Sequence, residues 1–532
     1  MTPPPDFLVR ISFITITIRT VLCNSHQTLF SIIRTTRPFI NMATYLQPGA
    51  DSPYRKFYHK PINEHNVHGP PFDAPVILTD RNGSLLHENE DKGLLHSIIA
   101  HDDVDLLKKY FAIEPQAIPN LFELPDGHEE ICEFGCLFSY AAECGSLGIL
   151  QTLLEYTTKS FEKGTPIRLS KANFQLLNVA AQFGQIEIVQ WLLDTEPIYA
   201  GIEDRDLRGF TALAAAANIF EFRLGFSPTW DQIRFDNSEA IMKLLLDHGA
   251  CASDVAHPTN DKDRKVPSVL SLAAQWARTD LLERLIDGGA DVHYKVAANS
   301  WKLDFGKQRD LPNKIEVNSL FLASLHANHD GVKTLVDHRA VGVDVVDMVC
   351  SRDCVASLPL HWAARSQLQH IPASFYNERA GNIRRTIEQL LSFAPTTINV
   401  QDNDKNTALH YATRHFGKNG SMFTPIFELL CSRGANASLR NYKDETPLHT
   451  LFQSHGDDGP IDIAAVSLLL SHGAKVTDVD EAGNTPLHIA TRNWHFIDAV
   501  ALLLEYGADP AQKNLKQENA LPIKMEYLLG NR

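Results

Sequence analysis

The four residues Thr485-Pro486-Leu487-His488 also occur at Thr446-Pro447-Leu448-His449, and earlier in the altered form Thr407-Ala408-Leu409-His410. The three copies begin at residues 407, 446 and 485, so they recur every 39 residues. A fixed period of about 20 to 50 residues is typical of proteins built from stacked structural repeats. The pattern therefore predicts an array of repeats, and it argues against a globular enzyme with one cleft.

Each position of the repeated motif has a physical role in a helix hairpin. Thr485 can accept a hydrogen bond from the first helical turn, and Pro486 has the backbone φ that suits the first helical position. His488 can bond neighbouring backbone groups through both ring nitrogens. The small Ala490 lets two helices approach closely, and Gly507 permits the left-handed conformation that ends the second helix.

The same pattern can be followed through most of the chain. Leucine-rich second helices that end in Gly-Ala are expected at 244–250, 285–291, 468–474 and 502–509. First helices are expected near 94–96, 138–142, 177–181, 211–213, 270–274, 320–323 and 359–364, and at the three motif copies. Residues 519–523 indicate a partial C-terminal capping unit. We therefore predict about ten units and a partial cap over residues 91–532, with stacking that buries each unit's apolar face.

The stretch from Gly483 to Ala490, followed by Gly507-Ala508-Asp509, resembles the repeat of the ankyrin-repeat protein family, and the resemblance extends over roughly residues 91–530. It implies an all-α solenoid of stacked helix-turn-helix units with short hairpin fingers, in which first helices line a concave face. It also implies a protein that binds protein partners through the concave face and the fingers, with no catalysis.

The N-terminal part of the chain differs from the repeats. Residues 1–41 contain Arg10, Arg19, Arg34 and Arg37 but a single acid, Asp6. This composition leaves three interpretations: a mitochondrial transit peptide, a signal peptide interrupted by Arg19, or a disordered or artefactual leader before a true start at Met42. Residues 42–90 are rich in proline and glycine, and we expect an extended lead-in segment there.

Charge and cysteine content limit the classes of partner and compartment. The net charge of the 532-residue chain is −15, and an acidic surface repels phosphate backbones, which argues against general nucleic-acid binding. Eight cysteines are too few for a disulfide framework, and no apolar run is long enough to span a membrane. We expect a monomer in the cytoplasm or nucleus, and in mitochondria only if residues 1–41 are a transit peptide.

The units of this chain are longer than the family's typical length of about 33 residues. The additional residues fall mostly between first and second helices, at 219–237, 366–382, 416–424 and 454–461, and one long insert lies in the finger region at 293–317. They are either tolerated surface loops or a widened edge that grips a partner. Four aromatic residues make the first insert the most informative: Phe220, Phe222, Phe226 and Trp230.

A basic row is the candidate binding site. Four residues after the motif histidine, at the end of the first helix, stand Arg365, Arg414, Gln453 and Arg492. The resemblance implies that this position faces the concave groove, where the arginines would receive carboxylates or phosphates of a partner. The adjacent residues Phe183, Trp276, His415 and Asn493 would join that surface. The alternative is that arginine at a helix C-terminus only complements the helix dipole.

The sequence lacks the common motifs of catalysis: it has no nucleophile elbow, zincin motif or phosphate-binding loop. His59, His65 and His68 lack metal-ligand spacing, so no metal or cofactor is expected. The predicted function is therefore a non-catalytic scaffold for protein–protein interaction. Two alternatives remain: a substrate adaptor for a modifying complex such as a ubiquitin ligase, with its recruiting element in residues 1–90, and an enzyme with a disguised N-terminal active site.

Overall fold

A computed structural model describes residues 54, 57, 76–88, 93–114, 137–160, 175–195, 201–206, 208–220, 232–257, 266–299, 314–340, 342–366, 373–417, 421–453 and 461–521. The leader 1–41, most of the lead-in segment and His59, His65 and His68 lie outside these residues, as do Phe222, Phe226 and Trp230. The chain divides after Ser97 into two units, which are described separately.

In the first unit, β1 (Ile77–Thr79) pairs antiparallel with β2 (Leu85–His87). Asp80 forms the turn between them, because one carboxylate oxygen accepts hydrogen bonds from the backbone N–H groups of Asn82 and Ser84. The expectation of extended chain through residue 90 therefore misses this hairpin. The buried Glu88 accepts hydrogen bonds from the backbone N–H groups of Leu94 and Leu95, in the first turn of α3 (Gly93–Ala100).

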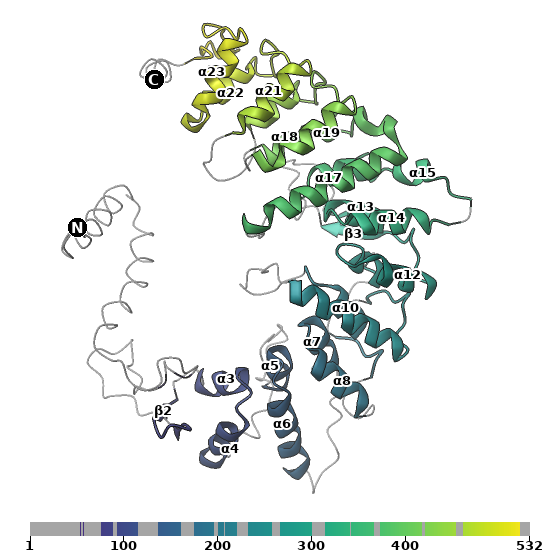
Figure 1. Cartoon of the computed structure of the whole chain (residues 1–532), viewed down its shortest axis with the longest axis vertical. Coiled ribbons are helices and arrows are strands. Elements are labelled where there is room, and N and C mark those ends of the chain that lie inside the picture. Colours follow the sequence, from purple (N-terminus) through teal and green to yellow (C-terminus); the bar gives the residue numbers. More distant parts are fainter. Residues whose placement is uncertain are drawn as a thin grey trace, which may run out of the picture. The chain divides into compact units, whose positions relative to one another are not determined.

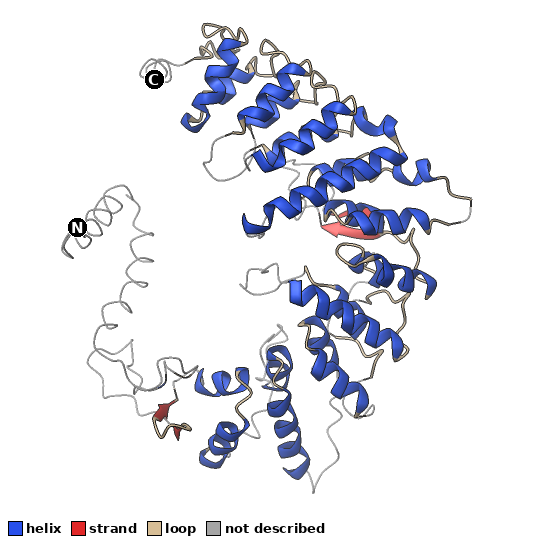
Figure 2. Cartoon of the chain, viewed as in Figure 1, coloured by secondary structure: helices blue, strands red, loops and turns tan. Residues whose placement is uncertain are grey.

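The second unit is mostly helical. Its first helices are α5 (Leu137–Cys144), α7 (Leu176–Gln182), α9 (Ala212–Ala217), α11 (Val269–Ala273), α13 (Ser319–Leu325), α16 (Pro359–Ala364), α18 (Ala408–Phe416), α20 (Pro447–Phe452) and α22 (Pro486–Ala490). Each of these nine helices packs against the next one. Figure 1 labels α5, α7, α13, α18 and α22 of this series, and Figure 2 shows that the strands of the described residues are short.

The second helices of the hairpins form a row of their own. They are α4 (Val104–Ile113), α6 (Leu147–Ser160), α8 (Ile186–Asp194), α10 (Gln232–Asp247), α12 (Thr279–Asp287), α14 (His329–Asp337), α17 (Tyr376–Phe393), α19 (Thr424–Ser432), α21 (Ile463–Ser471) and α23 (Ile497–Glu505). From α8 onward each packs against its successor in the series. Within its described residues the unit also contains α15 (Val345–Val349), η6 (Ala373–Phe375), η7 (Pro395–Asn399), η8 (Ser421–Phe423) and η9 (Trp494–Phe496). The one sheet of this unit within the described residues pairs β3 (Val296–Asn299) antiparallel with β4 (Lys314–Val317).

The core runs between the two series of helices. Every second helix from α8 on contributes a leucine that is almost fully removed from solvent: Leu192, Leu245, Leu285, Leu335, Leu390, Leu430, Leu469 and Leu503. Burying one leucine side chain contributes roughly 1.5–3 kcal/mol. The helix ends follow the expected chemistry, since Gly473 and Gly507 have φ angles of 93° and 85°. The buried leucines of α10, α12, α21 and α23 lie in the four segments that were predicted as leucine-rich second helices.

The motif histidines connect neighbouring repeats. His361, His410, His449 and His488 are buried, and each Nδ1 accepts a hydrogen bond from the backbone N–H of the residue that caps its helix, at 2.9–3.2 Å. Each Nε2 lies 3.0–3.2 Å from a backbone carbonyl of the following repeat, belonging to Val400, Glu445, Asn484 and Glu518. The predicted use of both ring nitrogens is confirmed. Only the neutral ring with a proton on Nε2 satisfies both partners.

The fingers are rigid turns joined by backbone hydrogen bonds. A single side-chain oxygen of Asp480 accepts from the N–H groups of Ala482 and Asn484, at 2.9 and 2.7 Å. Asp353, Asp402, Asn441 and Asn514 make the same pair of bonds in their own turns. Backbone hydrogen bonds also link each finger to the next. The N–H of Glu481 donates to the carbonyl of Lys443, and the N–H of Leu515 donates to the carbonyl of Ala482.

Replacing Asp480 by alanine is expected to lower the free energy of unfolding by about 2 kcal/mol, because two backbone N–H groups lose their acceptor. Asp480→Asn is the matched control, since its amide oxygen can keep both bonds and only the bond to the Asn484 amide is lost. Urea denaturation of both variants checks the prediction. Equal losses for alanine and asparagine would contradict it.

Candidate functional site

The predicted basic row lies at the C-terminal ends of four adjacent first helices. Arg365 follows α16, Arg414 lies in the last turn of α18, Gln453 follows α20 and Arg492 comes two residues after α22. The helices α16, α18, α20 and α22 pack side by side in that order. The four positions therefore form a row along the C-terminal ends of these helices. The structure thus brings these four residues into one region of the molecule.

Arg365 does not contribute an accessible cation to this row. Its side chain is 1% exposed, and its guanidinium lies over the rings of Trp362 and Tyr411, 4.3 and 5.4 Å from their centroids. Burial lowers the pKa of Arg365, while Tyr411 and the carboxylates of Asp353 and Asp402 act in the opposite direction. The expectation that Arg365 faces an open groove is therefore wrong: the side chain packs between two repeats.

The aromatic rings around Arg365 are themselves fixed by the fingers. The indole N–H of Trp362 donates to a carboxylate oxygen of Asp353 at 2.9 Å, and the hydroxyl of Tyr411 donates to Asp402 at 2.6 Å. Each aspartate uses its other oxygen for the turn of its own finger. Arg365 is therefore part of a buried cluster that joins two fingers to two first helices.

Arg414 and Arg492 remain as the accessible cations of the row. Arg492 is exposed and Arg414 is half-buried. Within the described part of the chain, neither guanidinium takes part in an ion pair or a hydrogen bond. Gln453 lies between them, and its amide donates to Glu445 at 2.8 Å. Two arginines without an acceptor, on repeats separated by one other repeat, are chemically suited to receive carboxylates.

The four residues that were predicted to join the row do not form one surface with the two accessible arginines. The half-buried Trp276 donates its indole N–H to the carbonyl of Ala217 at 2.9 Å, so it joins α11 to α9. Asn493 accepts from the N–H of His495 at 3.0 Å and caps η9. Phe183 ends α7 and His415 lies in α18, and both are half-buried. Phe183 and Trp276 thus belong to other repeats than the two accessible arginines.

A family model described as "Ankyrin repeats (3 copies)" matches residues 418–514, which include Gln453, Arg492 and the last two copies of the motif. This part of the chain is therefore similar to three ankyrin repeats. A comparison with curated proteins gives no match. In the described part of the chain, no helix has both the length and the apolar character needed to cross a membrane. These residues also contain no group of three or more His, Cys, Asp or Glu side chains that could hold a metal ion.

The long finger predicted as an insert at 293–317 packs onto the first helices. Val296 on β3 and Val317 on β4 form one buried cluster with Phe321, Leu325 and Trp362. Phe321 stands at the place of the motif histidine in α13. The described parts of this insert therefore cover Trp362, and this packing explains why Trp362 is fully buried. Residues 300–313 lie outside the description.

The first insert also packs back onto neighbouring helices where it is described. The ring of Phe220 stacks on His326, with centroids 4.5 Å apart, and lies 6.1 Å from Phe235. Phe235 in turn is 6.0 Å from Trp276. These half-buried aromatic side chains connect the ends of three first helices, so Phe220 has a structural role.

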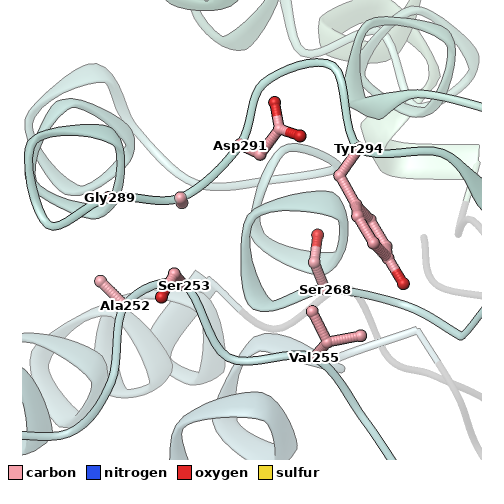
Figure 3. Close-up of a pocket in the computed structure, with 8 residues that line it drawn as sticks. Ala252, Ser253, Val255, Ser268, Gly289, Asp291 and Tyr294 are labelled. Carbon is pink, nitrogen blue, oxygen red and sulfur yellow. The ribbon is translucent and has the colours of Figure 1, made fainter.

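A small pocket lies between two finger regions, the turns after α10 and α12 (Figure 3). It is lined by Ala252, Ser253, Val255, Ser268, Gly289, Ala290, Asp291 and Tyr294. Its polar groups already serve the fold, since Ser268 accepts from the N–H of Ser271 and Asp291 from that of His293. Among the described residues that line the pocket there is no histidine, cysteine or lysine that could act on a substrate.

One candidate residue was missed in the sequence: Trp494, which is 65% exposed. It directly follows Asn493, a residue of the predicted binding surface, and stands two residues after Arg492. A tryptophan in a short polar connection was a signal that could have been used, because a loop aromatic residue either packs back or contacts a partner. Only the structure shows that this ring stays at the surface.

Proposed function

We propose that this ankyrin-repeat chain is a non-catalytic scaffold that binds a protein partner through the ends of its C-terminal first helices, together with the fingers. Ankyrin repeats generally mediate protein–protein interaction, and the match over residues 418–514 supports that role here. We further propose that the stacked hairpins form a solenoid of about ten units. The continuous packing of first helices from α5 to α22 supports this arrangement.

A single observation carries the proposal. Arg414 and Arg492 both lie at the C-terminal ends of first helices and have no acceptor within the described residues, although the chain has a net charge of −15. Elsewhere the described arginines commonly have acidic partners, as Arg433 has in Glu388 and Arg440 in Asp478. Cations left without a partner in an acidic protein favour recognition of groups from another molecule.

Affinity capture tests the proposal. We expect the double variant Arg414→Ser and Arg492→Ser to retain at least tenfold less of the proteins captured by the native chain, because a central arginine of an interface often contributes about 2 kcal/mol. Arg433→Ser is the matched control, since it removes an arginine that pairs with Glu388 on the second helices. Circular dichroism confirms that each variant is folded. Equal capture by the native chain and the double variant would refute this location of the binding site.

A further inference from the structure

Trp494 is held in place by the residues around it. It begins η9, which Asn493 caps by accepting the N–H of His495 at 3.0 Å. Phe496, at the other end of this short helix, is buried, and its ring lies 6.1 Å from that of Phe452. The indole of Trp494 lies against the His495 ring, with centroids 3.5 Å apart. The backbone of this segment is thus anchored while the tryptophan ring stays 65% exposed.

An exposed, anchored tryptophan is informative because most large aromatic side chains gain free energy by burial. Trp494 is the only tryptophan among the large exposed apolar side chains of the described residues. A ring that is already fixed loses little conformational entropy when a partner covers it. Tryptophan and arginine are also the residue types that most often dominate binding energy at protein interfaces. Trp494 and Arg492 combine both types within three residues of the chain.

The helix dipole does not account for Arg492. The helix α22 spans five residues, Pro486–Ala490, and the dipole of so short a helix is small. Arg492 also lies beyond the capping residue Thr491 and is exposed. A purely structural role therefore leaves the position of this guanidinium unexplained.

The carboxylate that contacts Gln453 of the row already has partners within the fold. Glu445 is buried, and its two carboxylate oxygens accept from the amides of Gln453 and Asn441, each at 2.8 Å. Its charge is thus satisfied by neutral donors within the fold. A carboxylate for Arg414 and Arg492 has to come from outside the described residues of the row.

We propose that the ends of α18, α20 and α22 bind an acidic peptide segment of a partner protein, whose carboxylates pair with Arg414 and Arg492 and whose apolar side chain packs on Trp494. The inference rests on the proposed scaffold function and names the chemistry of its partner. Carboxylates suit the site better than phosphates, because a dianionic phosphate is repelled more strongly by a chain of net charge −15.

A displayed library of short random peptides, panned on the full chain, provides the probe. We expect the selected peptides to carry Asp or Glu close to an apolar residue. For a synthetic selected peptide, Arg492→Gln and Trp494→Ala should each raise the Kd about tenfold or more, and replacing the peptide's acids by Asn and Gln should do the same. Binding should also weaken between about 50 and 500 mM NaCl, because exposed ion pairs are screened.

Matched variants keep the test specific. Arg433→Gln removes an arginine of the second helices, and Tyr506→Ala removes an aromatic ring that is 51% exposed elsewhere. Both should bind the selected peptide as the native chain does. Calorimetric titration measures all Kd values, and thermal unfolding monitors the fold.

Four outcomes would overturn the inference: selected peptides without acids, peptides that bind the Arg492 and Trp494 variants unchanged, peptides that need phosphoserine in place of Asp or Glu, or the absence of any selected peptide. The first three leave the scaffold function intact if protein capture still depends on Arg414 and Arg492. Loss of that dependence in the capture experiment would instead refute the scaffold site itself. The two failures are therefore distinguishable.

Discussion

Replacing Trp362 by alanine is expected to lower the free energy of unfolding by about 4 kcal/mol. Trp362 is fully buried and packs in one cluster with Val296, Val317, Phe321 and Leu325. Truncating such a side chain removes its transfer free energy and leaves a cavity that the surrounding repeats fill only in part. The expected loss is large enough to unfold a domain of average stability.

Two polar contacts add to the cost of the Trp362→Ala substitution. Asp353 loses the indole N–H that now binds its second carboxylate oxygen, and Arg365 loses one of the two rings on which its guanidinium lies. A buried charge with fewer partners is unfavourable. Trp362→Phe keeps a ring but not the hydrogen bond, so we expect a smaller loss than for alanine.

Denaturation by urea, followed by circular dichroism, measures the effect. Trp494→Ala is the matched control: the same substitution at a ring that is 65% exposed should cost under about 1 kcal/mol. Hydrogen exchange should localise the loss of protection in Trp362→Ala to α13, α16 and the β3–β4 hairpin. A loss no greater than that of Trp494→Ala would show that the hairpin does not cover Trp362 in solution.

Acid is expected to destabilise the C-terminal repeats well above the pH at which exposed carboxylates are protonated. Burial lowers the pKa of His361 to about 3 and that of His410 to about 4, and it lowers the pKa of His449 and His488 as well. A protonated ring would place an N–H where Nδ1 now accepts one from the backbone. The folded state therefore keeps these rings neutral, while the unfolded chain binds protons below about pH 6.5.

The direction of the effect follows from this difference in bound protons. Between pH 6.5 and the pKa of the folded state, the unfolded chain binds more protons, so stability falls as the pH falls. On acidification from pH 7 to pH 5, His361 and His410 should each lower the free energy of unfolding by about 2 kcal/mol. Asp402 acts in the opposite direction, because burial raises its pKa to about 6. Its protonation in the folded state should raise the free energy of unfolding by about 1 kcal/mol over the same interval. We expect a net loss of about 2–3 kcal/mol from these three groups.

The chain itself suggests the control variant. Asn178 occupies the motif histidine position in α7, and its amide donates to the carbonyls of Asp204 and Phe210. The double variant His361→Asn and His410→Asn should therefore fold with reduced stability at pH 7 but lose less on acidification. Urea unfolding at pH 7 and pH 5 measures both values. A native chain whose stability does not change between these two pH values would contradict the prediction.

The local chemistry of the sequence determined the repeating unit. The spacing of Thr485, Pro486, His488 and Gly507 depends on interactions between residues close in the chain, such as helix capping, the φ of proline and the left-handed glycine. These interactions operate in the same way wherever the hairpin is placed. The helix pairs, the buried leucines and the bonds of the histidine ring could therefore be predicted before any coordinates.

What the sequence could not determine is which side chains of the row stay accessible. Arg365, Arg414 and Arg492 occupy equivalent positions, yet Arg365 is buried and its guanidinium lies over the rings of Trp362 and Tyr411. Trp276 and Trp494 likewise look alike in the sequence, but only Trp494 remains at the surface. Exposure is the result of packing between residues far apart in the chain, such as Val296 and Trp362, and no local pattern records that packing. The sequence alone thus determined the hairpin, and the tertiary structure decided which of its polar and aromatic side chains can reach a partner.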